Sequence, residues 1–410
     1  MATRNGRPRY FENDGVASAE PFDPSAEVAK QLAHLVVTYP PQPETFLGLN
    51  GDDLLGLYSG STSIAYGLFL LAPRWSAAVQ GKPLLEWAKA YLDTAKKVAA
   101  VSKAEMIQMP IDSQNCGTLH EMAVRLTVQA VIEEDDAAVN ELLSRVPAVC
   151  ADSEVRTNDE WCYGRAGFLY LLRVIAHYRP AFREAITKAQ MSVIEAIMRG
   201  VSGKDSAGWR FHGRLYIAVG HGWAGIIAQV LLTDPSASRA AQLRPWLVKC
   251  IDEQQPDGSW KCFIDDAEHA GTDAQAREIV SMGHGAPSML LGLLAVRSIY
   301  ENAGDDEIVR KIDTAVARAQ DHIWEKGLLT KESCLLHGAA GNSLVLLDHA
   351  RKQKFMEYSV QERLDKGVKD GSIEESEPRS GLNKGIVGRC WAMLEYRDGR
   401  SGVYPTFNEV

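Results

Sequence analysis

Three histidines stand next to glycine at the start of apolar segments that lie far apart in the chain: His221, His284 and His337. Imidazole exchanges protons near neutral pH, so each of them could act as a general acid or base. A single histidine in an apolar segment is usually a core residue with satisfied hydrogen bonds. Three at equivalent places favour a shared pocket, and we predict acid–base catalysis there. The simpler interpretation is that they only hydrogen-bond the ends of helices.

The glycines beside these histidines belong to a longer series. One glycine from each Gly-rich segment gives positions 60, 117, 164, 222, 285, 338 and 385, with successive differences of 57, 47, 58, 63, 53 and 47 residues. Seven units of roughly fifty residues indicate an internal repeat. The sequence therefore has to be interpreted as a repeat architecture before any single motif is considered.

Each repeat predicts two kinds of helix. The residues after a Gly-rich segment, such as 226–232, are apolar on all sides, as in a helix buried on all sides. Between them lie amphipathic segments such as 306–319, which place apolar residues at helical spacing on one stripe. We predict an all-α fold, an α/α toroid of seven inner and seven outer helices. Small residues at the inner helix starts would let these ends crowd around one mildly electropositive pocket.

The predicted domain organisation is an N-terminal strap over 1–50 and one toroid over 51–410. The strap is proline-rich, with one helix expected at about 25–38. Three arginines at 4, 7 and 9 would reach the pocket if the strap folds over it, although a frayed terminus is the alternative.

Composition excludes several classes of protein. The net charge is −9 and no basic block stands out, so we expect no nucleic-acid partner. No apolar run has transmembrane length, and no leader segment is evident at the start. The seven cysteines are scattered and form no C-x-x-C pair, which is typical of reduced thiols. We therefore expect a cytoplasmic protein.

The motifs that open the repeats resemble those of the LanC-like (lanthionine synthetase C-like) family, and the resemblance covers nearly the whole chain. The segments that carry it are Arg9-Tyr10-Phe11-Glu12-Asn13, Tyr163-Gly164-Arg165-Ala166-Gly167, Gly220-His221-Gly222-Trp223-Ala224-Gly225, His284-Gly285-Ala286-Pro287, His337-Gly338-Ala339-Ala340-Gly341-Asn342 and Gly381-Leu382-Asn383-Lys384-Gly385-Ile386-Val387-Gly388.

The resemblance implies a zinc-dependent thiol chemistry. In that family, one zinc is held by a cysteine before the fifth-repeat His-Gly and by an adjacent Cys-His in the sixth repeat. The metal binds a thiol, lowers its pKa and presents a thiolate for addition to a dehydroamino acid. Bacterial members close thioether rings in peptides, and eukaryotic members resemble enzymes that add glutathione to proteins containing dehydroamino acids. A histidine of the fourth repeat, here His221, is thought to handle protons.

This sequence departs from the family at the metal ligands. The two cysteine positions hold Gly283 and Leu336, and only His337 of the three ligands remains. Glycine and leucine offer no donor, so we expect no metal and no other cofactor. Two nearby cysteines, Cys262 and Cys334, are the alternatives that could restore a site.

Four further residues of these repeats are candidate substrate-binding residues: Arg165, His120, Tyr163 and Asn342. Arg165 could bind a carboxylate at the pocket mouth, or it could pair with a neighbouring acid and pin a loop. His120 stands at a similar place in the second repeat, where it could line the pocket or belong to its wall.

We interpret the chain as a zinc-independent enzyme acting on a small molecule by cyclisation, isomerisation or conjugate addition. Its expected partner is a small molecule or modified peptide, with glutathione as one candidate. The alternative is a non-catalytic LanC-like protein that binds glutathione or a peptide. A glycosidase on a similar toroid would need a pair of catalytic acids, which the sequence does not offer.

Overall fold

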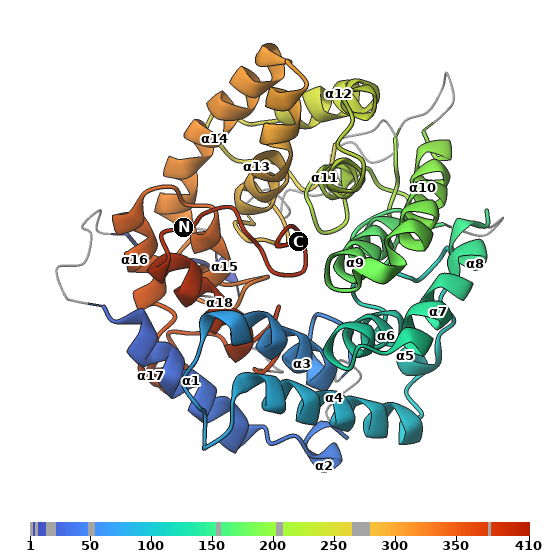
Figure 1. The fold of residues 1–410 in the computed structure, drawn as a ribbon. Helices are drawn as coiled ribbons and strands as arrows, with labels where there is room; N and C mark the ends of the chain where they lie inside the picture. The colour runs from blue at the N-terminus through green and yellow to red at the C-terminus, as the bar shows by residue number, and fades with distance from the viewer. Residues whose placement is uncertain are drawn as a thin grey trace.

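The computed structural model describes residues 3–4, 7–13, 22–47, 54–152, 157–201, 208–264, 279–375 and 379–410. Figure 1 shows two concentric rings of helices in this part of the chain. The inner ring consists of α3 (Gly60–Leu71), α6 (Glu121–Ile132), α9 (Arg165–Tyr178), α11 (Trp223–Thr233), α13 (Ala286–Asn302), α15 (Ala339–Leu344) and α18 (Ile386–Arg397). α18 packs against both α15 and α3, so the inner ring closes on itself.

The outer ring carries the amphipathic helices. They are α1 (Pro24–Thr38), α4 (Leu84–Val101), α7 (Asp136–Ser144), α8 (Val146–Cys150), α10 (Arg183–Arg199), α12 (Ala237–Asp252), α14 (Asp306–Lys326), α16 (His349–Glu357) and α17 (Gln361–Asp370). Short helices α2 (Pro43–Phe46), α5 (Glu105–Gln108), η1 (Ala72–Arg74) and η2 (Pro180–Phe182) lie in the connections.

The predicted all-α toroid is confirmed, and so is the predicted N-terminal helix, which is α1. The strands among the described residues are β1 (Thr3–Arg4) and β2 (Arg7–Pro8), a short antiparallel pair. The predicted boundary between residues 50 and 51 lies outside the described residues. α1 packs along α18, so the segment expected to be a strap also supplies one helix of the outer ring. Among the described helices, none is both long and apolar enough to cross a membrane.

Glycine is required in the first turn of the inner helices α9, α11, α15 and α18, where the preceding loop lies against the helix. A Cβ on Gly225 would lie 2.0 Å from the Val219 carbonyl oxygen, and one on Gly341 would lie 1.7 Å from the Leu335 oxygen. Both distances are far below van der Waals contact, so any side chain would push the loop off the helix. The glycine pattern of the sequence therefore records a close backbone approach that recurs around the ring.

The C-terminal tail fills the centre of the ring, where Figure 1 places the C-terminus. The Phe407 carbonyl accepts hydrogen bonds from Arg173 of α9 (2.7 Å) and Gln229 of α11 (3.0 Å). The Glu409 carboxylate accepts hydrogen bonds from the hydroxyl groups of Tyr66 and Tyr170. These contacts connect the chain end to α3, α9 and α11, so the tail is part of the core.

We expect Phe407→Ala to lower the free energy of unfolding by about 3–5 kcal/mol, because the ring is fully buried and packs edge-on against Trp161. Leu347→Ala is the matched control, since Leu347 is 53% exposed and its loss should change stability by less than about 0.5 kcal/mol. Urea unfolding followed by circular dichroism measures both variants. Equal stability of the two variants would contradict a structural role for the tail.

Candidate functional site

The loops that precede the inner helices surround a cavity of about 220 Å³. Its lining includes Tyr58, Cys162, Tyr163, His221, His284 and His337. The structure therefore brings the three predicted histidines together, although they are separated by 63 and 53 residues in sequence. Each stands directly before the glycine that precedes an inner helix: Gly222 before α11, Gly285 before α13 and Gly338 before α15.

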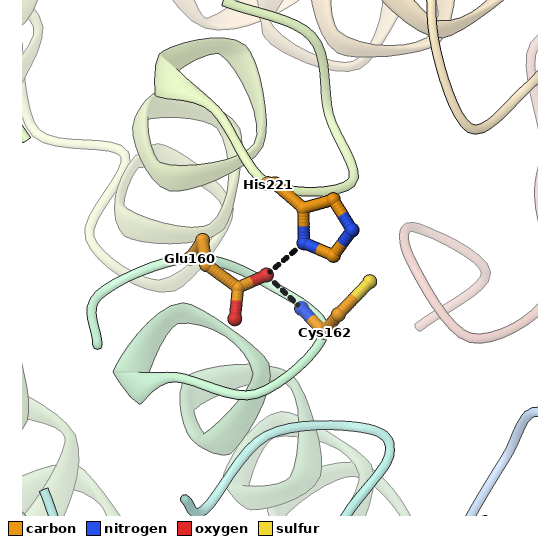
Figure 2. Close-up of side chains that lie close together, drawn as sticks. All are labelled: Glu160, Cys162 and His221. Atoms are coloured by element: carbon orange, nitrogen blue, oxygen red, sulfur yellow. Dashed lines mark hydrogen bonds and ion pairs between the residues drawn. The ribbon is translucent and has the colours of Figure 1, made fainter. Parts of the chain in front are cut away.

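His221 is held by a buried carboxylate. Its Nδ1 lies 3.0 Å from Oε2 of Glu160, whose side chain is 2% exposed. The same carboxylate accepts the backbone N–H groups of Cys162 at 2.7 Å and Tyr163 at 2.5 Å. The Phe211 ring stacks on the imidazole with centroids 4.5 Å apart and planes 2° apart. Figure 2 shows the second ring nitrogen of His221 pointing away from Glu160.

His284 and His337 are uncharged at neutral pH. Burial, reinforced by the nearby His221, lowers the pKa of His284 to about 4. Burial, reinforced by the charge of Lys331, lowers the pKa of His337 to about 3. The His284 Nδ1 atom is buried and makes no hydrogen bond with the described residues. Both imidazoles are therefore free bases under physiological conditions.

A second cavity, of about 340 Å³, shares His284 and His337 with the first. Its lining adds three cationic residues, Arg9, Lys326 and Lys331, and one acid, Glu374. Arg9 arrives there because the N-terminal segment pairs with the loop after α14: Phe11 N–H donates to the Leu328 carbonyl at 2.7 Å, and Thr330 N–H donates to the Arg9 carbonyl at 3.0 Å. Arg9 of the predicted strap thus lines this adjoining cavity and not the cavity between the three histidines. The side chains of Arg4 and Arg7 lie outside the described residues.

Among the predicted binding residues, only Tyr163 lines the cavity between the histidines. Arg165 lies behind its wall, where its guanidinium binds Asp159 at 3.1 Å and the Val149 carbonyl at 2.8 Å. The structure thus favours the loop-pinning interpretation of Arg165 over contact with a ligand. A substrate contact would require it to leave these buried partners.

His120 and Asn342 also belong to the wall and not to the cavity lining. His120 is 1% exposed, and its Nδ1 accepts the Ala123 N–H at 3.2 Å as the N-cap of α6. The amide of Asn342 donates to the carbonyls of Val280 and Gly327, both at 2.9 Å. Neither placement supports the predicted contact with substrate, and such a role remains a prediction.

The residues at the family's metal positions do not fit zinc. A Cβ on Gly283 would lie 3.1 Å from Cε1 of His337, so the two positions are adjacent, but only His337 has a donor atom. Leu336 is apolar. The alternative cysteines, Cys334 and Cys262, are buried and do not line the cavity, and the Cys334 sulfur accepts the backbone N–H of His337 at 3.4 Å. Among the described residues, the group that could hold a metal is a different one, formed by Glu160, Cys162 and His221.

Sequence reasoning missed Glu160, Cys162 and Phe211. Cys162 carried a signal, because it stands two residues before the glycine that starts an inner helix, as Gly220 and Gly283 do. Glu160 carried none, since its partner His221 is 61 residues away. The place of Phe211 depends on how its loop folds back over His221.

This chain is similar in sequence and in fold to known proteins. A family model described as lanthionine synthetase C-like protein matches residues 52–406. The glutathione S-transferase LANCL1 of Danio rerio is 23% identical over 255 residues, which is 56% of this chain and 56% of that protein. The chain thus spans little more than half of that relative. The solved structure of nisin cyclase is 16% identical, with a TM-score of 0.62 over 92% of this chain and 95% of that chain.

Restoring cysteines at positions 283 and 336 tests whether the backbone still has the geometry of a metal site. We expect Gly283→Cys combined with Leu336→Cys to raise the zinc content by about one ion per chain, because two thiolates then join the His337 imidazole. The control replaces both positions by serine, which offers no thiolate. Elemental mass spectrometry measures zinc, and an unchanged content in the folded cysteine variant would contradict the expectation.

Proposed function

This chain belongs to the lanthionine synthetase C-like family, and we propose that it is an enzyme that acts on a small molecule by histidine acid–base chemistry, without the family's zinc. The observation that carries the proposal is the convergence of His221, His284 and His337 on one cavity. Two of the three metal positions have lost their donors, whereas the imidazoles around them are retained. Such a pocket can still move protons.

The three imidazoles offer different roles. His284 and His337 are neutral, so they can accept a proton from a substrate. His221 differs because Oε2 of the Glu160 carboxylate lies 3.0 Å from its Nδ1 atom and orients the ring. The ring centroids of His221 and His284 lie 5.9 Å apart. A small substrate could therefore lose a proton to one ring and receive a proton from another.

The reactions that fit are cyclisation, isomerisation and conjugate addition, because each requires a proton to leave one atom and reach another. Conjugate addition of a thiol is the first to test, and two observations support it. A relative carries the name glutathione S-transferase. The adjoining cavity presents Arg9, Lys326 and Lys331, whose charges suit the carboxylates of glutathione.

The second candidate function is non-catalytic binding of glutathione or a modified peptide. The cavity lined by Arg9, Lys326 and Lys331 supports a binding protein as well as it supports an enzyme, because binding requires only complementary charge and shape. Calorimetry with glutathione, beside an assay of thiol consumption, separates the two functions. Binding without consumption of any offered electrophile would favour the binding protein.

We expect His284→Ala and His337→Ala each to lower kcat/KM by about 10²–10⁴-fold, the usual contribution of a general acid or base. His177→Ala is the control, since His177 is exposed on α9 outside the cavity. The assay follows loss of glutathione thiol with a panel of α,β-unsaturated small molecules and dehydroalanine peptides. Full activity in both cavity variants would contradict the proposed chemistry.

As the pH is lowered, kcat/KM should begin to fall only well below about pH 6.5, the ordinary pKa of histidine. The pKa values of His284 and His337 are about 4 and about 3, so falling pH protonates these bases only near those values. We therefore expect kcat/KM to be retained at about pH 5, provided that circular dichroism shows a folded protein. If kcat/KM of the His221→Ala variant still fell with a midpoint near about pH 6.5, the assignment of His284 and His337 as bases would be contradicted.

A further inference from the structure

We propose that Glu160, Cys162 and His221 form a binding site for a divalent metal ion of the zinc class, at a place in the ring different from the family's zinc positions. Each residue offers one donor atom, and these atoms all lie within 4.8 Å of one another. Figure 2 shows the three side chains close together on the loops before α9 and α11, with the Cys162 sulfur pointing away from the Glu160 carboxylate.

The donor set suits zinc. Thiolate, imidazole and carboxylate are its usual protein ligands, and three of them with one open position are typical of a catalytic site. Two donors on one tetrahedral zinc, each at about 2.0 Å, lie about 3.3 Å apart. Oε2 of Glu160 and Nδ1 of His221 are 3.0 Å apart, so an ion could replace the proton that they share with little movement.

The charge balance of the cluster also favours a cation. The side chains of Glu160 and Cys162 are buried, at 2% and 6% exposure. In the described residues, the ion pairs of Glu160 are limited to the one with His221. A divalent ion would compensate the carboxylate charge and favour the thiolate.

The surroundings hold the donors in place. Backbone N–H groups of Cys162 and Tyr163 fix the Glu160 carboxylate, and Phe211 stacks flat on the His221 ring. Such outer contacts orient ligands and increase metal affinity. The Glu160 and His221 donors are thus held in place before an ion arrives.

The repeats explain why a second place in the ring can offer the same pair of donors. Cys162 stands two residues before Gly164, the N-cap of α9, and His221 stands one residue before Gly222, the N-cap of α11. Gly283 and His337 hold these same places before α13 and α15, and the Cβ position of Gly283 lies 3.1 Å from the His337 ring. The Cys162–His221 pair therefore has the equivalent geometry, two inner helices away.

The proposed ion would face the cavity between the histidines, because Cys162 and His221 both line it. Its open position would take the sulfur of a thiol substrate or a water molecule. This assigns His221 to the metal and leaves His284 and His337 as bases. The inference builds on the proposed function in that it uses the same cavity. It revises the expectation of a metal-free chain, which considered only residues around the fifth and sixth repeats.

Metal binding can be measured without turnover. The full-length protein, purified without chelators and equilibrated with zinc sulfate, is passed through a desalting column, and its zinc is counted by elemental mass spectrometry. We expect about one zinc per chain, and loss of most of it in Cys162→Ala and His221→Ala. Cys150→Ala is the matched control, because Cys150 is a free cysteine outside the cavity. Circular dichroism verifies that each variant is folded.

Cobalt(II) substitution identifies the ligand directly, because a thiolate ligand gives an intense sulfur-to-cobalt charge-transfer band. We expect the band in the wild type and in the milder variant Glu160→Gln, with at least about tenfold weaker affinity in the latter. The band should be absent in Cys162→Ala. This readout tests the site even if an alanine variant folds poorly.

Three results would overturn the inference. They are a wild type that binds neither zinc nor cobalt, zinc retained in Cys162→Ala, and zinc lost in His337→Ala but kept in His221→Ala. Zinc at the expected residues without any turnover would contradict the proposed function and leave this inference standing. Turnover in a protein that binds no metal would contradict this inference and leave the proposed function standing.

Discussion

In four of the inner helices, α9, α11, α15 and α18, the first turn lies so close to the preceding loop that no side chain fits between them. At Gly167, Gly225, Gly341 and Gly388, an added Cβ would lie within 2.1 Å of the carbonyl oxygen of the residue six positions earlier. This close approach sets the path of each loop, and so the direction in which the residues before the helix project. The cavity exists because the loops of several repeats turn inward in this same way.

The same turn gives four of the repeats two places on the cavity lining, one and two residues before the N-cap glycine. The occupants are Cys162 and Tyr163 before α9, Gly220 and His221 before α11, Gly283 and His284 before α13, and Leu336 and His337 before α15. Because the scaffold repeats, a donor lost at one place can be replaced at another without any change of fold. A change of chemistry within this architecture therefore needs only a few substitutions.

Both ends of the chain complete the site. The N-terminal segment pairs with residues 328–330 and brings Arg9 to the cavity that adjoins His284 and His337. The C-terminal tail enters the ring centre, and there Tyr404 donates a hydrogen bond to Asn383, a cavity residue, at 2.6 Å. The termini thus determine charge at one side of the histidines and packing at another.

Glycine spacing and helical periodicity were enough to predict the repeat, the all-α toroid and the convergence of His221, His284 and His337, because both are local properties that a linear pattern preserves. The sequence also showed that Gly283 and Leu336 cannot bind a metal. It could not place Arg165, His120 and Asn342 in the wall, because burial depends on which loops pack over them. Only the tertiary structure joined Glu160 and Cys162 to His221, since that contact spans two repeats and is set by the curvature of the ring.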